Sequence, residues 1–462
     1  MKLSASEIAK GVKAVRLAAS EQIVPGGFSI DSRTLNPGDC FFAIQGKNFD
    51  GHQFIPEAVI KGASLVIASA ASSFPADPAW PIVYVDDTLT ALQELATSVR
   101  KIWGKCLIGV TGSNGKTTTK EITSFLLESS YRVFKSIGNF NNEYGLPLSM
   151  LRLTENHEVA VMEMGMSHVG EIRQLCQIAR PDIGIVTNVR AVHLANFKSI
   201  HGIAAAKREL IEGLSRDGIG LLNNDDPQVR KFGRAFPGIV LTFGVGAPAT
   251  FRATDIKSEG LRGNSFRLNF KSKAHRMCLP LIGEHNVFNS LPAIAVAHRF
   301  GMDFESIDQR LLQLKPVSGR GEILSFEDGF TVINDTYNSN PAALQALIKF
   351  LKKVPGYRRK ILVAGEMLEL GPSAEVFHRE CGRMAADGGI DLIIGVQGLA
   401  EHLVRAAREH GYDNSNARFF GDSVSAGEAL CQEIRSGDLI LLKGSRGVKT
   451  EKALEALKQK FR

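Results

Sequence analysis

Two glycines, a lysine and two threonines within residues 112–118 form a pattern that could bind the phosphates of a nucleoside triphosphate. Backbone N–H groups at Gly112 and Gly115 can turn toward phosphate oxygens at the positive end of a helix. Lys116 would supply a positive charge, and Thr117 a hydroxyl for Mg²⁺. The other loop positions assigned to the same ATP site are Ser113, Asn114 and Thr118. This motif predicts an ATP-dependent enzyme.

A buried strand and a helix are predicted to position this loop. Residues 106–110 form a short apolar run that suits a buried strand, and residues 120–127 place apolar side chains along one helical face. The generic phosphate-loop pattern requires a glycine at position 110, where valine stands, so the chain has a shorter form of the loop. The competing interpretation is a plain glycine turn before a helix.

Length and composition indicate a soluble protein of about three domains, because 462 residues at roughly 150 per domain suggest three. No apolar run is long enough to cross a bilayer, and the first residues lack the apolar core of a secretory signal, so we expect no membrane insertion and a cytoplasmic location. The net charge of +7 forms no long basic run or aromatic stripe, which favours small polyanions over nucleic acid. Solubility alone explains the charge nearly as well.

The six cysteines are scattered and form no Cys-x-x-Cys pair, which favours reduced core thiols over zinc or disulfides. They are Cys40, Cys106, Cys176, Cys278, Cys381 and Cys431.

Apolar segments and turns divide the chain into three predicted domains, at residues 1–105, 106–315 and 316–462. The first alternates short apolar segments with turns, the densest being 41–44 and 63–67. The other two alternate strands with helices, which is typical of parallel α/β sheets. The predicted strands are 106–110, 158–164, 182–187 and 219–222 in the second domain, and 331–334, 360–364, 391–396 and 438–442 in the third.

The alternation of strands with helices is interrupted between about 240 and 282, where short strands with glycine turns suggest an antiparallel insertion. A helix is predicted after it, at 289–300. A proline and glycine link at 315–321 then leads into the third domain.

Motifs outside the phosphate loop resemble the Mur ligase family over nearly the whole chain. They occur in order at 31–33, 37–38, 43–46, 50–52, 138–142, 163–165, 187–188, 193, 206–209, 284–286, 319–320, 335–341, 365–371 and 443–446. The resemblance implies an N-terminal α/β uridine-nucleotide domain and a central ATPase-like parallel sheet with an antiparallel insertion. It also implies a C-terminal Rossmann-like domain that binds a dipeptide.

Residues 335–341 and 366–370 look like the family members that join D-alanyl-D-alanine to UDP-N-acetylmuramoyl-tripeptide. The motifs of the tripeptide-forming relatives, Asp-Tyr-Ala-His and Asp-Asn-Pro-Arg, are not found. The resemblance implies an acyl-phosphate intermediate, and we expect a monomer. The motifs leave open the oligomeric state and whether the third residue of the tripeptide is lysine or diaminopimelate. The alternatives are a tripeptide-forming Mur ligase and a folylpolyglutamate synthase-like ligase, although the latter lacks the uridine domain that residues 31–33 indicate. A non-catalytic dinucleotide-binding module is disfavoured because no Gly-x-Gly-x-x-Gly follows the early strands of the third domain.

Four residues are predicted to carry the catalysis: Lys116, Glu163, His193 and Lys207. Glu163 closes an apolar strand, so its carboxylate would emerge beside the phosphate loop and hold Mg²⁺ with Thr117, unless it is simply a solvated strand end. By themselves, His193 suggests a structural histidine and Lys207 a surface charge on a helix. The resemblance instead implies that His193 lies near a second Mg²⁺ and that a carbamate on Lys207 binds it.

The substrate-binding candidates follow the same resemblance. Asn286 would read the adenine of ATP or cap a helix, while Arg320 and Asp335 would grip its phosphate and ribose once the domains close, unless they are a linker charge and a helix cap. The predicted uridine-diphosphate residues are Ser32, Arg33, Gly46, Asp50 and His52, and the muramoyl-peptide residues are Asn139, Asn141 and Asn142. The predicted dipeptide residues are Tyr337, Asn338, Asn340, Glu366, Met367, Leu370, Lys443 and Ser445.

Overall fold

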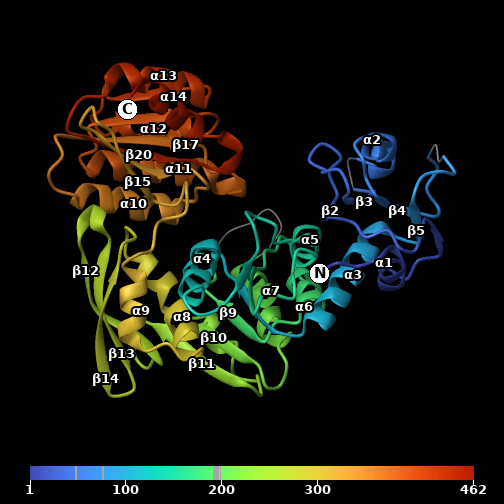
Figure 1. Cartoon of the computed structure of the whole chain (residues 1–462). Coiled ribbons are helices and arrows are strands. Elements are labelled where there is room, and N and C mark those ends of the chain that lie inside the picture. The colour runs from blue at the N-terminus through green and yellow to red at the C-terminus, as the bar shows by residue number, and fades with distance from the viewer. Residues whose placement is uncertain (47–48, 75–76, 191–196, 198, 462) are drawn as a thin grey trace. The chain divides into compact units, whose positions relative to one another are not determined.

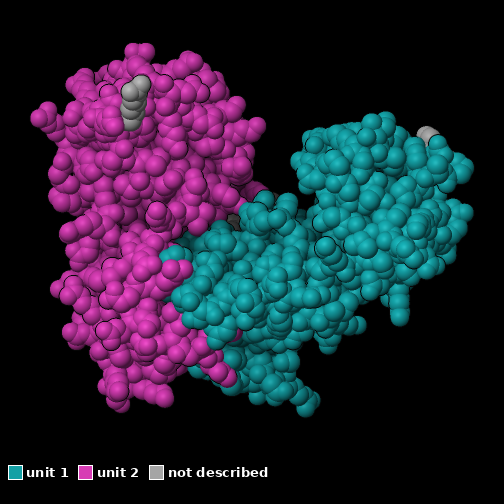
Figure 2. All heavy atoms as spheres, viewed as in Figure 1, with its two compact units in different colours: residues 1–189, 201–243 teal, residues 190–200, 244–462 magenta. Residues whose placement is uncertain are grey.

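The computed structural model describes residues 1–461 apart from 47–48, 75–76, 191–196 and 198. The chain forms two compact units (Figure 2). Unit 1 comprises residues 1–189 and 201–243, and unit 2 comprises 190–200 and 244–462. None of the helices in the described part of the chain combines the length and apolar character that crossing a bilayer requires.

A small sheet opens unit 1, with the strand order β1-β5-β4-β3-β2 (Figure 1). Its strands run parallel except β1, which is antiparallel to β5. The strands are β1 Arg16–Ala18, β2 Phe28–Ser29, β3 Cys40–Phe42, β4 Leu65–Ser69 and β5 Ile82–Val85. The helices are α1 Ala5–Gly11, η1 Gly51–Phe54, α2 Ile55–Ile60 and α3 Thr88–Trp103. The predicted apolar segments coincide with β3 and β4 to within two residues.

The larger sheet of unit 1 is parallel in the order β11-β10-β9-β6-β8-β7. Its strands are β6 Cys106–Thr111, β7 Val133–Lys135, β8 Val159–Glu163, β9 Ile183–Val186, β10 Ile219–Asn223 and β11 Ile239–Gly244. Its helices are α4 Lys116–Leu127, α5 Gly145–Met150, α6 Glu171–Ala179, α7 Ile200–Glu212 and η2 Val229–Lys231. The four predicted strands are confirmed.

One prediction for this region is wrong at its edge. The antiparallel segment was expected from about residue 240, but β11 pairs parallel to β10, with Ile219 opposite Ile239. The antiparallel strands begin only with β12, in unit 2. A short apolar run predicts a strand but not the direction of its partner, because pairing is decided in three dimensions.

The first strands of unit 2 form an antiparallel meander, β12 Phe251–Ser258, β13 Asn264–Phe270 and β14 Lys273–Leu279, with η3 Gly260–Arg262 in its first turn. Two helices follow, α8 His285–Arg299 and α9 Phe304–Leu311. The predicted helix at 289–300 therefore starts four residues earlier. The ring of His298 stacks on Phe304 with 4.4 Å between centroids, and this contact packs the two helices together.

The last sheet of unit 2 has the order β15-β16-β20-β17-β18-β19, parallel except for β15. The strands are β15 Glu322–Ser325, β16 Thr331–Asp335, β17 Arg359–Gly365, β18 Leu392–Val396, β19 Ala417–Phe420 and β20 Asp438–Lys443. The helices are α10 Pro341–Lys353, η4 Gly371–Ser373, α11 Ala374–Asp387, α12 Ala400–Glu409, α13 Ser423–Glu433, η5 Arg446–Val448 and α14 Glu451–Lys460. Side chains of α10, α11 and α12 share one hydrophobic core with the sheet, and those of α13 and α14 share the other.

The predicted three-domain α/β fold is confirmed. All six cysteines are free, as expected. The two compact units do not test the predicted boundaries, because residue 105 lies inside unit 1 and residue 315 inside unit 2. In unit 1, helix α3 of the first predicted domain packs against α5 and α6 of the second. Those boundaries stay predictions.

Candidate active site

The predicted phosphate loop lies between β6 and α4, at the carboxyl edge of the parallel sheet. Gly115 precedes the helix with φ of 83°, and Gly112 has φ of 151°. A Cβ on Gly112 would lie 1.8 Å from Thr187 Oγ1, so only glycine fits there. The N-cap of α4 is Gly115, which has no side chain of its own to cap the helix. Its N–H groups and the positive helix end therefore suit a phosphate.

The ammonium of Lys116 stays over this loop. Its Nζ donates to the carbonyl oxygens of Gly112 at 2.9 Å and Ser113 at 3.4 Å. The positive charge is thus already located where the loop would receive a triphosphate.

Thr187 and Asn188, which directly follow β9, stabilise the conformation of the loop. The Asn188 carbonyl accepts from Ser113 N at 2.9 Å, and its side-chain oxygen accepts from Asn114 N at 3.0 Å. Thr187 Oγ1 donates to the Asn114 carbonyl at 2.6 Å. Neither residue was among the predicted site residues, although 187–188 was one of the motifs of the family resemblance and lies at the end of a predicted strand, at the edge where α/β proteins bind ligands.

Glu163 ends β8 beside the loop. Its Oε2 accepts from the Thr117 hydroxyl at 2.8 Å, and its Oε1 accepts from the Asn141 amide at 2.9 Å. Glu163 is 4% exposed, so the alternative of a solvated strand end is wrong. A carboxylate and a hydroxyl are ligands that a hard cation such as Mg²⁺ prefers.

His193, predicted to lie near a second metal ion, falls outside the described residues. Within the part of the chain that is described, no three His, Cys, Asp or Glu side chains gather into a metal-binding group. The roles of Thr117, Glu163 and His193 toward a metal ion stay predictions.

Lys207 is buried on α7, with 3% of its surface exposed. One helical turn later, Leu210 packs against Gly109 of β6 and Gly184 of β9, which brings α7 close to the sheet. Burial, and then the positive charge of Lys116, hold the pKa of Lys207 well below its usual value. The prediction of a solvated surface lysine is wrong, because tertiary packing turns this helical face inward. A buried amine with a lowered pKa has a larger neutral fraction, which can act as a nucleophile.

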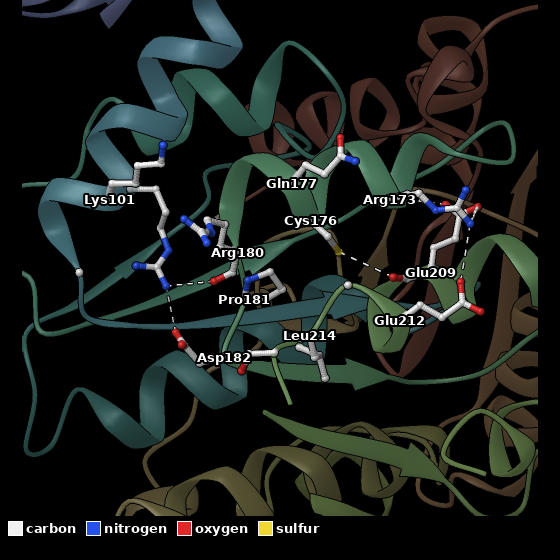
Figure 3. A pocket seen from close by; sticks show the side chains of 14 residues that line it. Lys101, Arg173, Cys176, Gln177, Arg180, Pro181, Asp182, Glu209, Glu212 and Leu214 are labelled. Atoms are coloured by element: carbon white, nitrogen blue, oxygen red, sulfur yellow. Dashed lines mark hydrogen bonds and ion pairs between the residues drawn. The ribbon is translucent and has the colours of Figure 1, made fainter. Parts of the chain in front are cut away.

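Helix α7 is anchored to α6 by a second buried side chain, Glu209 (Figure 3). Its carboxylate accepts from Gly170 N at 2.8 Å and Arg173 N at 3.0 Å, so it caps the N-terminal end of α6. This contact fixes the helix that carries Lys207.

A cavity of about 780 Å³ lies between α3, α6 and α7 (Figure 3). None of the predicted site residues lines it. Arg100 pairs with Asp182 at 3.0 Å, and Arg173 with Glu212 at 3.6 Å. The cavity is lined mainly by side chains that hold the helices together, so we assign no chemistry to it.

A larger cleft of about 1740 Å³ lies within unit 1, and Ser32 and Arg33 line it. Gly46, Asp50 and His52 do not. His52 is buried, with Nδ1 bonded to Asp50 at 2.6 Å and Nε2 accepting from Ser69 N at 2.9 Å. His52 and Asp50 therefore brace the domain. The exposed rings of Phe49, Phe54 and Phe140 line the cleft and were not predicted.

The three predicted asparagines of unit 1 take different places. Asn141 reaches Glu163, Asn142 Oδ1 accepts from Gly145 N at 2.9 Å at the start of α5, and Asn139 is exposed. Arg33, proposed for a pyrophosphate, is exposed and holds Asp31 through two hydrogen bonds of 2.9 and 2.7 Å.

In unit 2, Asp335 and Lys443 end the neighbouring strands β16 and β20 and form an ion pair. Lys443 Nζ also donates to the Asn338 carbonyl at 2.9 Å. His285, which was not predicted, lies beside this pair: burial lowers its pKa, Asp335 opposes that effect and Lys443 adds to it. Asn340, and not Asp335, caps α10 by accepting from Ala343 N at 3.0 Å. The alternative of a cap for Asp335 is therefore wrong.

Tyr337 lies against two arginines. The Arg320 guanidinium is 4.0 Å from the ring centroid, and that of Arg446 is 5.9 Å away. Asn286 lies in the first turn of α8, but its amide donates to the Ile282 carbonyl at 2.8 Å and does not cap the helix. Its adenine contact stays a prediction.

The remaining dipeptide candidates gather where β17 and β20 end. Glu366 Oε1 accepts from Leu399 N at 3.0 Å, and Ser445 Oγ accepts from Leu368 N at 3.0 Å. Met367 and Leu370 are buried in the core of unit 2. Their side chains pack the domain, and their contact with a dipeptide stays a prediction.

Three family models match the chain: Mur ligase family, catalytic domain (26–100), Mur ligase middle domain (110–297) and Mur ligase, glutamate ligase domain (319–446). The chain is 37% identical to a UDP-N-acetylmuramoyl-tripeptide–D-alanyl-D-alanine ligase of Bacillus subtilis, over 95% of this chain and 94% of the relative. It is 34% identical to the enzyme of that name in Escherichia coli, over 93% of each chain.

Solved structures show the same architecture. The crystal structure of MurF from Acinetobacter baumannii matches with a TM-score of 0.90 at 28% identity, over 99% of each chain. MurF ligase from Thermotoga maritima in complex with ADP matches with a TM-score of 0.81 at 31% identity, over 94% of this chain and 97% of that one. Folylpolyglutamate synthase of Mycobacterium tuberculosis shares only the fold, at 17% identity. The chain belongs to the Mur ligase family.

Proposed function

We propose that this chain uses ATP to join D-alanyl-D-alanine to UDP-N-acetylmuramoyl-tripeptide, which gives the pentapeptide precursor of peptidoglycan, ADP and phosphate. The observation that carries the proposal is its 37% identity, over nearly the whole length of both chains, to the Bacillus subtilis ligase of that name. The phosphate loop supplies the physical basis for using ATP.

The reaction needs an activated carboxylate, because a carboxylate cannot lose oxide to an amine at neutral pH. The terminal carboxylate of the tripeptide attacks the γ-phosphorus of ATP, the bond to the bridging oxygen breaks, and ADP leaves. The amine of the dipeptide then attacks the acyl carbon and loses a proton, and phosphate leaves as the amide forms. Lys116 and the N–H groups of α4 would hold the triphosphate for this transfer, in which positioning and charge neutralisation dominate.

We assign Mg²⁺ binding to Thr117 and Glu163, with His193 at a second ion. When bound, Mg²⁺ neutralises charge on the triphosphate. We also propose that the neutral amine of Lys207 adds to CO₂: an N–C bond forms, a proton leaves, and the resulting carbamate offers two oxygens to the second ion. A mass increase equal to CO₂ on the Lys207 peptide, lost at acidic pH, would support this. An unmodified Lys207 in the active, Mg²⁺-loaded enzyme would contradict it.

The other assignments are also proposals. Asn286, Arg320 and Asp335 would contact ATP, and the aromatic-lined cleft with Ser32 and Arg33 would take the uridine nucleotide. The residues around Tyr337, Asn338 and Lys443 would take the dipeptide. We further propose a cytoplasmic monomer without a nucleic-acid partner. The charge pattern supports the last point, because the basic residues form no long run or aromatic stripe.

The assay supplies ATP, Mg²⁺, D-alanyl-D-alanine and UDP-N-acetylmuramoyl-tripeptide, in parallel with lysine and with diaminopimelate as third residue, and detects the pentapeptide by mass. If the rate of phosphate release does not depend on the concentration of D-alanyl-D-alanine, the dipeptide is not the acceptor.

Lys116→Ala should lower turnover by at least about a thousandfold, because the loop loses its charge on the transferring phosphate. The fold, checked by thermal unfolding, should persist. Lys101→Ala, an exposed lysine on α3, is the matched control and should retain activity. Retained activity in Lys116→Ala would refute the phosphate site.

A further inference from the structure

Lys120 lies one helical turn after Lys116 on α4 and is 1% exposed, which makes it one of the largest fully buried side chains of the protein. Its Nζ donates to the Ser136 carbonyl at 2.6 Å and pairs with Glu121 Oε1 at 3.0 Å. Burying an ammonium is expensive, and an apolar residue of similar volume often stabilises such a position equally well. Stability alone therefore explains this lysine poorly.

Ser136, which directly follows β7, links Lys120 to Glu163. Its carbonyl accepts from Lys120, and its side-chain oxygen accepts from the backbone N–H of Glu163 at 3.0 Å. Ser136 is itself 1% exposed, so water does not compete for these bonds.

The chain that leaves Ser136 returns to Glu163 a second time. Asn141 donates its amide to Glu163 Oε1 at 2.9 Å, and the Asn141 carbonyl accepts from Gly165 N at 2.8 Å. Glu163 Oε2 is left to the Thr117 hydroxyl. The segment from Ser136 to Asn141 thus contacts both the backbone and the carboxylate of Glu163, and Lys120 holds the start of that segment.

We propose that Lys120 is a positioning residue: by holding the Ser136 carbonyl it fixes Glu163 and Asn141, so that the Glu163 carboxylate is presented with Thr117 to the metal ion of ATP. The inference rests on the proposed function for the role of Glu163. Groups that orient the ligands of a metal ion typically change metal affinity and turnover without touching the ion.

A second lysine offers a matched control. Lys135 Nζ pairs with Glu121 Oε2 at 2.8 Å, so Glu121 bridges Lys120 and Lys135. Burial raises the pKa of Glu121, but the hydrogen bonds and charges of Lys135 and Lys120 outweigh it, so the net pKa lies below the usual range. Lys135 has the same ionic partner as Lys120 but is 39% exposed. Removing it tests loss of the ion pair without loss of the Ser136 contact.

The experiment compares wild type, Lys120→Met, Lys135→Met, Ser136→Ala and the double variant Lys120→Met/Ser136→Ala. For each we measure kcat, KM, the Mg²⁺ concentration at half-maximal rate, the Mg²⁺ dependence of ADP binding by calorimetry, and Tm. Calorimetry needs neither peptide substrate. A wild type that binds Mg·ADP but forms no pentapeptide would therefore count against the proposed function and leave this inference testable.

Lys120→Met should raise the Mg²⁺ requirement by about tenfold or more and lower kcat by about a hundredfold, with little change in the KM for the dipeptide. Lys135→Met should change both by less than about twofold. Ser136→Ala should also raise the Mg²⁺ requirement, and the double variant should lose no more than the worse single variant, because the two residues act in series.

The inference is overturned if Lys120→Met and Lys135→Met differ only in Tm. It is also overturned if the losses of the Lys120→Met and Ser136→Ala single variants multiply in the double variant. If Lys120→Met does not fold, Ser136→Ala decides alone. An unchanged Mg²⁺ requirement in that variant would refute the proposal.

Discussion

Lys207 shows how a single buried residue can oppose stability. Its folded-state pKa lies well below the value of 10.5 expected when unfolded, chiefly because of burial. Between these two pKa values the unfolded chain binds more protons than the folded chain, so stability rises with pH in that window. Below the folded pKa the cost of burying the ammonium is fully present. The fold therefore keeps this residue despite a stability cost, as functional sites often do.

Lys207→Met should consequently raise Tm at pH 7, by at least about 2 °C, while activity is lost. The gain over wild type should shrink as pH rises toward 10.5. Thermal unfolding of both proteins in CO₂-depleted buffers from neutral to alkaline pH measures it, since CO₂ could modify the wild-type amine. A Tm of Lys207→Met below that of wild type at pH 7, or a difference in Tm that does not change with pH, would contradict a stability cost from the buried ammonium.

At the scale of elements, the active edge of unit 1 depends on contacts between helices and strands that are distant in sequence. Glu209 on α7 caps α6 from outside that helix, and Thr187 and Asn188 after β9 hold the phosphate loop. Gly170, which precedes α6, has no side chain that could cap it. The cap must come from a neighbouring helix.

Glu209→Gln should lower the free energy of unfolding by about 1–2 kcal/mol, because the buried carboxylate of Glu209 accepts two N–H groups at a helix N-terminus, whereas an amide offers one acceptor. Glu212→Gln, three residues later on the same helix and 43% exposed, is the control and should change it by less than about 0.5 kcal/mol. Urea unfolding followed by circular dichroism makes the comparison. Equal losses in the two variants would show that the cap contributes nothing special.

At the scale of the whole molecule, an excess of positive charge accompanies small anionic substrates. The chain carries 55 Lys and Arg against 48 Asp and Glu, and the difference is its net charge of +7. Such a field attracts nucleotides from a distance, and salt screens it.

The KM for UDP-N-acetylmuramoyl-tripeptide should therefore rise severalfold between about 0.01 M and about 0.1 M salt, over which the Debye length falls from about 30 Å to about 10 Å. The KM for the zwitterionic D-alanyl-D-alanine should change much less. Steady-state kinetics at constant Mg²⁺ provide the test. Equal salt dependence of both substrates would argue against steering by net charge.

Patterns within a short stretch of sequence were sufficient to predict the phosphate loop and the buried parallel strands. Residues 106–118 carry both the apolar run and the glycine spacing, so strand, loop and Lys116 are all local. The edge strands β15 and β19 were missed because they are half-exposed, and their side chains form no continuous apolar run. The parallel pairing of β11 with β10, the strand before it, was also missed, since a short apolar run does not show the direction of its partner.

The site divides in the same way. The sequence by itself determined the family and the phosphate loop with Lys116 and Thr117, because these follow from residue types at fixed spacing; Glu163 was predicted from its place at the end of an apolar strand. Only the tertiary structure decided that Lys207 and Lys120 are buried, and that His52 binds the backbone of Ser69 and thereby braces its domain. Burial and contacts of this kind depend on elements that pack together from separate parts of the chain, and no short pattern contains them.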